Sequence, residues 1–237
     1  MGDTVLDPAR DPALAPVLEV AVAHERDVPG AAEGGAHRIR LAAPGRLSPE
    51  PAVVSAVCRE SDLPVHVELR LTDSWTTTGG ELARLVGLAA DYAACGAAGF
   101  SFGFLDADLE VDLAVCTHLA ERLPDGLPWT FSDAFDASLD PRRSWRRVRT
   151  LPGLVGVRSA GSPQGMAVGY DDLLATAADP AVARLVVAGG GLLAEHVPWL
   201  LRAGVRQLAV DTQVRPGASY RSYVDAGHVR SWRRLLG

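Results

Sequence analysis

The sequence predicts a single-domain (β/α)₈ TIM barrel, an α/β fold. Short β-like runs alternate with helix-like runs along all of the 237-residue chain, and eight such units in unbroken series are typical of a parallel sheet closed into a barrel. With 48% hydrophobic residues, the chain can also bury one substantial core. An open doubly wound sheet is the alternative, but residues 22–26 (VAHER) stand where such sheets carry a glycine-rich phosphate loop.

The expected strands are short runs rich in aliphatic and aromatic residues. In chain order they are VLEVAVA at 17–23, RIRLA at 38–42, VHVELRL at 65–71, GFSFGFL at 99–105, PWTF at 128–131, LVGV at 154–157, RLVVA at 184–188 and RQLAV at 206–210. Several follow a Gly-Ala or Gly-Val step, as expected when a glycine closes the preceding helix.

Helical patterns fill the intervals between these strands. They cover residues 49–60, 80–95, 112–122, 141–150, 170–178, 192–202 and 220–236, while the first crossover, near 29–34, is short and weakly helical. We therefore assign residues 16–237 to one barrel domain. Residues 1–15 are rich in Asp, Pro and Ala and are expected to form a flexible N-terminal arm.

Composition and charge exclude several classes of function. The net charge is −6, and all 23 basic residues are arginine, so no lysine amine is available for Schiff-base chemistry. No basic run is long enough to follow a phosphate backbone, and we expect no nucleic-acid partner. The one basic cluster, at 142–149, follows the helix-start pair Asp140-Pro141 and is interpreted as a solvated helix face.

Nothing in the sequence indicates a membrane or secreted protein. No apolar run approaches the roughly 18 residues of a membrane span, and no basic segment followed by an apolar core marks a signal peptide. Cys58, Cys95 and Cys116 form neither a CxxC pair nor a disulfide framework. We expect a cytoplasmic protein.

Four carboxylates near the ends of the expected strands are the candidate catalytic residues, because function in such barrels gathers at the C-terminal ends of the strands. They are Glu68, Asp133, Asp136 and Asp211. Two neighbouring carboxylates can act as an acid and a base, and their oxygens also suit Mg²⁺. The alternative is that each carboxylate forms an ion pair with a nearby arginine.

A second set of residues at the strand ends is suited to binding a small anion. Guanidinium groups hold carboxylate or phosphate as a fork, and backbone amides before a helix, here expected to begin at residue 192, can cradle an anion. The alternative for the glycines is a purely steric role in a tight turn. Histidines and cysteines are not spaced as metal ligands, so we predict no metal site. The candidate ligand-binding residues are Arg40, Arg70, Arg158, Ser159, Gly189, Gly190 and Gly191.

Several segments together resemble the copper homeostasis protein CutC family, and their order and spacing carry the resemblance. The similar segments are LEV at 18–20, GGAHRIRLA at 34–42, RLSP at 46–49, PVH at 64–66, GFLDAD at 103–108, WTFSDAFD at 129–136 and AGGG at 188–191. The resemblance implies a cytosolic barrel linked to copper tolerance. It also implies a homodimer, for which Trp199 and Trp232 on late helices are candidate interface residues.

The chain departs from the family motifs at polar positions expected at the barrel mouth. The family's "ELC" glutamate and cysteine correspond to Arg40 and Ala42, and its "HRAFD" histidine and arginine to Ser132 and Asp133. Because copper prefers thiolate and imidazole ligands, we expect no copper site. The sequence favours a diverged enzyme or a binder of a small anionic metabolite. The alternative is a non-catalytic partner or copper-homeostasis protein that keeps only the barrel scaffold.

Overall fold

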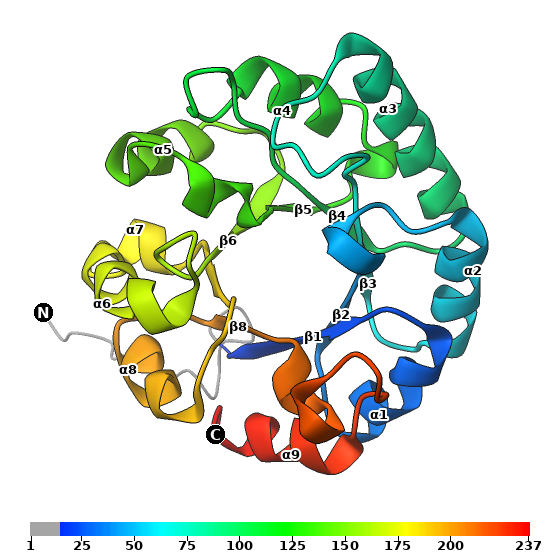
Figure 1. Ribbon diagram of the computed structural model, residues 1–237, viewed down its shortest axis with the longest axis vertical. Helices are drawn as coiled ribbons and strands as arrows, with labels where there is room; N and C mark the ends of the chain where they lie inside the picture. The colour runs from blue at the N-terminus through cyan, green and yellow to red at the C-terminus, as the bar shows by residue number, and fades with distance from the viewer. Residues whose placement is uncertain (1–14) are drawn as a thin grey trace, which may run out of the picture.

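The computed structural model describes residues 15–237 as a closed barrel of eight parallel strands inside a ring of helices (Figure 1). The strands pair in chain order, and β8 pairs with β1. This closure confirms the predicted fold and shows that the open-sheet alternative is wrong. Residues 1–14 of the expected arm lie outside the described residues. The strands are β1 Val17–Val22, β2 Arg38–Leu41, β3 Val65–Glu68, β4 Gly99–Phe102, β5 Trp129–Phe131, β6 Leu154–Ser159, β7 Val186–Ala188 and β8 Gln207–Val210.

Nine α-helices in the described part of the chain surround the strands. Side-chain caps begin many of them: Thr78 and Glu81 form a reciprocal capping box, and Asp112, Asp140 and Asp225 each accept a hydrogen bond from a backbone N–H of the helix that follows. The helices are α1 Val28–Glu33, α2 Pro51–Glu60, α3 Gly79–Ala94, α4 Leu113–Ala120, α5 Pro141–Val148, α6 Met166–Thr176, α7 Pro180–Ala183, α8 Val197–Arg202 and α9 Ala226–Arg234. None of the helices within residues 15–237 has the length and hydropathy needed to cross a bilayer.

Three predicted helix starts were wrong, and the helix expected from residue 170 begins four residues earlier, at Met166. The pattern placed a helix at residue 192, but α8 begins at Val197, because the His196 imidazole accepts a hydrogen bond from Leu193 N–H at 3.2 Å and a single 3₁₀ turn comes first. The pattern from 220 to 236 begins as a helix only at Ala226, after Asp225. Short 3₁₀ turns at Thr212–Val214 and Pro216–Ala218 occupy the loop after β8.

The apolar core lies between the strands and the helices, rather than on the barrel axis. Outward-facing strand residues such as Leu18, Ile39 and Phe100 are fully buried. Inside the barrel the buried side chains are largely polar. His66 lies there beside Gly99, where a β-carbon would come within 2.6 Å of its ring. The polar inward-facing set continues upward from this point and forms the floor of the barrel mouth.

Candidate functional site

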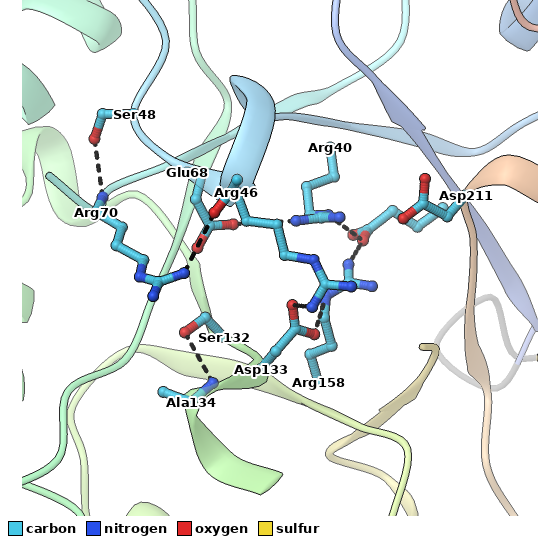
Figure 2. Close-up of polar contacts among 12 residues, drawn as sticks. Arg40, Arg46, Ser48, Glu68, Arg70, Ser132, Asp133, Ala134, Arg158 and Asp211 are labelled. Atoms are coloured by element: carbon cyan, nitrogen blue, oxygen red, sulfur yellow. Dashed lines mark hydrogen bonds and ion pairs between the residues drawn. The ribbon is translucent and has the colours of Figure 1, made fainter. Parts of the chain in front are cut away.

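A network of ion pairs crosses the barrel interior below the C-terminal ends of the strands (Figure 2). Glu19 on β1 accepts a hydrogen bond from Arg38 Nε at 2.7 Å and pairs with Arg158, which reaches it from β6 on the far side of the barrel. Arg40 on β2 lies beside Glu68 on β3, with 3.3 Å between Nη1 and Oε2. Glu19, Arg40, Glu68 and Arg158 are all at most 5% exposed.

Burial and the paired charges set the ionisation of this network. Burial alone would raise the pKa of Glu19, but the Arg38, Arg158 and Arg40 guanidinium groups together hold that pKa below its ordinary value. Burial raises the pKa of Glu68, against the opposing effect of Arg40. Glu68 is thus engaged by an arginine, as the alternative reading of the carboxylates expected.

A second layer of charge lies above this network, at the mouth. Asp133 begins the 3₁₀ turn Asp133–Ala137 after β5, where Ser132 accepts a hydrogen bond from Ala134 N–H. The Asp133 carboxylate pairs with Arg46 and lies 3.6 Å from Arg158 Nε. Arg46 has a left-handed backbone (φ 58°) directly after Gly45 (φ 75°), and this turn directs its side chain across the mouth (Figure 2).

Two cavities open at the mouth, and Arg46 and Asp211 line both of them. The β1–β2 cavity, of about 450 Å³, is lined by Ala21, Val22, Ala23, Arg40, Ala42, Ala43, Pro44, Gly45, Arg46, Asp211 and Tyr220. The β6–β8 cavity, of about 550 Å³, has among its lining residues Trp75, Asp133, Asp136, Ala160, Gly190, Gly191, Leu192 and Gln213. Tyr220 donates a hydrogen bond to Asp211 and stacks over Arg215, with 4.5 Å from guanidinium carbon to ring centroid.

Asp136 and Ser159 form a hydrogen-bonded pair at the edge of the β6–β8 cavity. Ser159 Oγ donates to Asp136 Oδ1 at 2.6 Å, and Ala160 N–H donates to Oδ2 at 2.7 Å. Burial raises the pKa of Asp136 to about 6, although these hydrogen bonds lower it. Asp136 is therefore a carboxyl group that can gain or lose a proton near neutral pH.

The three consecutive glycines differ in what they do. A β-carbon on Gly189 would lie 2.9 Å from Arg158 Nη1, so this glycine leaves room for the arginine. Gly190 and Gly191 have positive φ angles of 76° and 92° and line the β6–β8 cavity. Because α8 begins only at Val197, the expectation that these glycines lead directly into a helix N-terminus was wrong.

Arg70 lies apart from the ion-pair network and ties two loops together. Its guanidinium group contacts Asp73 Oδ1 at 3.0 Å and the carbonyls of Gly45 and Ser74, and it stacks over Trp75 with 3.8 Å to the ring centroid. The structure therefore gathers Arg40, Glu68, Asp133, Arg158 and Asp211 into one region and places Arg70 beside it (Figure 2).

Sequence reasoning missed two central members of the network. Neither Glu19, which lies in the middle of an apolar strand, nor Arg46 was singled out. The glycine directly before Arg46, just after a strand end, was the signal that could have identified it as a residue held by a special turn.

The donor set at the mouth does not fit copper. Within residues 15–237, no three His, Cys, Asp or Glu side chains are grouped so that they could hold a metal ion. Cys58 and Cys116 lie on α2 and α4, and Cys95 follows α3, all outside the barrel mouth. Burial, with a smaller effect of Arg38, lowers the pKa of His66 to about 4, but this imidazole lies deep among the strands. The thiols are thus away from the mouth, and His24, which follows β1, belongs to no group of three such side chains in the described part of the chain.

Comparisons with known proteins identify the family. A model of the CutC family matches residues 16–213. The chain is 30% identical over 214 residues to a family protein CutC of Klebsiella pneumoniae strain 342, which covers 84% of each chain. A second Klebsiella pneumoniae family protein CutC, from strain ATCC 700721 / MGH 78578, is 31% identical over 181 residues, covering 73% of this chain and 71% of the relative.

Solved structures show the same fold. The putative copper homeostasis protein CutC from Streptococcus agalactiae superposes with a TM-score of 0.70 at 18% identity, covering 82% of this chain and 97% of that one. A 3-hexulose-6-phosphate synthase superposes with a TM-score of 0.65 at 17% identity, covering 93% and 100%. At these identities the structures establish the barrel alone. On the family model and the two sequence relatives, the chain belongs to the CutC family.

Proposed function

We propose that this CutC family member binds a small organic anion at the mouth of its barrel, in the β1–β2 cavity. The proposal rests on the incomplete hydrogen bonding of the buried Arg40 guanidinium group. The residue is 4% exposed and lines the cavity, yet its one hydrogen bond to another described residue goes from Nη1 to Glu68. Its buried Nε lies 3.9 Å from Glu19 Oε1, and the Nε–H has no hydrogen-bond partner within the described chain. Buried donors are normally satisfied, and a carboxylate or phosphate is the usual acceptor for a guanidinium fork.

The other lining residues define the chemistry of the ligand. Arg46 adds a second guanidinium group at the rim, and the Asp211–Tyr220 pair offers polar contacts opposite Arg40. The remaining wall is made largely of alanines, and the volume of about 450 Å³ lies at the small end of the range for metabolite sites. These features favour a short carbon skeleton with one carboxylate or phosphate group and a hydroxyl or amino group at its other end.

Proton transfer at the neighbouring β6–β8 cavity is the second candidate function. Asp136 supports it, because a carboxyl group whose pKa is about 6 is suited to general acid or base catalysis near neutral pH. In this reading Ser159 orients Asp136, and Glu68 and Asp133 hold the arginines in place rather than react. Gly190 and Gly191 would allow a ligand to approach the backbone closely. The Mg²⁺ alternative is less favoured, since Glu68 and Asp133 are already engaged by arginines.

Binding at the mouth can be tested by calorimetry with a panel of 2-hydroxy acids, amino acids and small phosphate esters. Arg40→Lys keeps the positive charge beside Glu68 but removes the Nε donor and the planar fork. Arg46→Gln removes the second guanidinium group. We expect at least one panel member to bind the wild-type protein saturably, and each variant to bind it about tenfold more weakly, the loss of one charge-assisted contact.

The matched control for this experiment is Arg122→Gln. Arg122 is exposed beyond α4, far from the mouth, and donates to the His118 carbonyl. The Arg122→Gln variant should bind the same panel member with the affinity of the wild-type protein. The proposal is wrong if no panel member binds, or if all three variants weaken binding to the same extent.

Three further expectations accompany this proposal. We propose that no copper cofactor is bound. Calorimetric titration with Cu(I) and Cu(II) tests this, and a saturable one-to-one complex would contradict it. We propose a cytoplasmic location. We also propose a homodimer, measurable by light scattering: Trp199 is 53% exposed on α8, whereas Trp232 packs partly against the core. A stable complex with another protein and no small-molecule ligand would instead support the non-catalytic partner role.

A further inference from the structure

A cavity of about 990 Å³ lies outside the barrel, in a groove between α5 and α6. Figure 1 shows these two helices on either side of β6. Aromatic and aliphatic side chains, among them Phe135, Trp145, Leu173 and Val182, line the groove, and Phe135 packs on Trp145 with 4.5 Å between ring centroids. Neither the ion-pair network nor the β1–β2 cavity uses this groove.

The arginines of α5 divide into two groups. Arg143 and Arg147 both pair with Glu110, in the loop after β4, and neither lines the groove. Arg142 and Arg146 line the groove and form no ion pair with any residue between 15 and 237. One wall of the groove is therefore positively charged and uncompensated, in a helix that the sequence alone suggested was merely solvated.

A buried hydroxyl group provides an independent indication of a ligand. Ser138 lines the groove and is only 7% exposed, and its Oγ has no hydrogen-bond partner within the described residues. Buried side-chain hydroxyl groups are normally paired. Ser138 and Arg142 line the same groove, so a ligand that contacts Arg142 has a second polar group within the same site.

The opposite wall limits what the groove can accept. Asp172 and Asp179 line it from the α6 and α7 side. Asp179 pairs at 3.5 Å with Arg149, which also lines the groove, so Asp172 is the acidic group of this wall without an ion pair to any described residue. A molecule with several anionic groups would be repelled from that wall. The groove is instead complementary to a flat apolar molecule with a single anionic group. The anionic group would face the arginines of α5, and the apolar part would pack on the floor, away from the acidic wall.

We propose that the α5–α6 groove is a second binding site, for a small aromatic molecule that carries one carboxylate or phosphate group. The ring packs on Phe135 and Trp145, the anionic group lies between Arg142 and Arg146, and the Ser138 hydroxyl donates to it. The site is separate from the β1–β2 cavity. Its inner end reaches Asp136, which also lines the β6–β8 cavity.

Calorimetry with 2-naphthoate as the probe tests the proposal. We expect saturable one-to-one binding to the full chain, and much weaker binding of the uncharged analogue 2-naphthalenemethanol. The double variant Arg142→Gln/Arg146→Gln should bind 2-naphthoate at least about tenfold more weakly, because two charge-assisted contacts are lost. Ser138→Ala should weaken binding by about two- to fivefold.

Two controls decide whether the groove is the site. Arg143→Gln changes the same helix outside the groove, and Arg46→Gln changes only the mouth, so both should bind 2-naphthoate like the wild-type protein. Absence of saturable binding, or equal affinity for the double variant and Arg143→Gln, would overturn the proposal. Loss of binding in Arg46→Gln would also overturn it, by placing the probe at the mouth. Unfolding curves check that each variant is folded.

Discussion

Replacement of Asp136 by asparagine should remove a defined pH dependence from the stability of the barrel. The carboxyl group accepts hydrogen bonds from Ser159 Oγ and Ala160 N–H, but burial outweighs them and raises its pKa from 3.8 to about 6. Asparagine has nearly the same shape and keeps an acceptor for Ala160 N–H, but it does not titrate. The variant thus removes the titration of this carboxyl group while leaving the side-chain packing nearly unchanged.

The sign and the size follow from linkage. Below pH 3.8 the group is protonated in both the folded and the unfolded chain, and its stabilising contribution is fully present. Between pH 3.8 and about 6 the folded chain holds more protons than the unfolded chain, so the free energy of unfolding falls as the pH rises. At about 1.4 kcal/mol per pKa unit, the total loss is roughly 3 kcal/mol and is complete above about pH 6.

Urea unfolding followed by circular dichroism at several pH values from 4 to 7 measures this effect. The free energy of unfolding of the wild-type protein minus that of Asp136→Asn should fall by roughly 3 kcal/mol across this range. Asp171→Asn, on the exposed face of α6, controls for the loss of a carboxyl group. A difference that stays flat with pH would refute the reasoning, because the carboxyl group would then titrate alike in the folded and unfolded chains.

The remaining predictions concern packing and a buried ion pair. Gly99→Ala places a β-carbon 2.6 Å from the His66 ring, so the free energy of unfolding should fall by about 1–3 kcal/mol in urea titrations. Gly87→Ala, in the exposed part of α3 with no atom nearby, should instead raise it by about 1 kcal/mol. Arg215→Met strands the Asp27 carboxylate, which Arg215 holds through two hydrogen bonds of 2.9 and 2.8 Å, and should cost about 3–5 kcal/mol. An unfolding free energy equal to the wild-type value in Gly99→Ala or Arg215→Met would contradict these contacts.

The sequence was sufficient for the fold, because alternating short strands and helices closed by glycine leave few arrangements open. It was less informative about which strand residues face the axis. His66 lies inside the barrel, where Gly99 on the neighbouring strand leaves space for its ring. A period of two separates the faces of a strand without showing which face meets the helices, and in this barrel the inner face is the polar one.

The mouth was predicted less completely, since its contacts join residues that are remote in sequence. Arg158 meets Glu19 across 139 positions, and Arg46 meets Asp133 across 87. The spacing of residues along the chain does not predict pairs that are so far apart in sequence. The predicted catalytic and ligand-binding roles of the mouth residues stay predictions until the binding experiments are done.

Arg40 and Asp133 are linked through Glu19 and Arg158, and this linkage has an evolutionary consequence. The family motifs that the chain resembles carry a glutamate at the position of Arg40 and an arginine at the position of Asp133, and Asp133 is close enough to help raise the pKa of Arg40. The two replacements exchange opposite charges between interacting sites and leave their sum unchanged. Reversal of Arg40 alone would crowd acidic groups beside Glu19 and Glu68, and reversal of Asp133 alone would crowd arginines beside Arg46 and Arg158. We therefore expect the two replacements to have occurred together, or through an uncharged residue at one of the two positions. The residues at positions 40 and 133 should accordingly vary together among relatives.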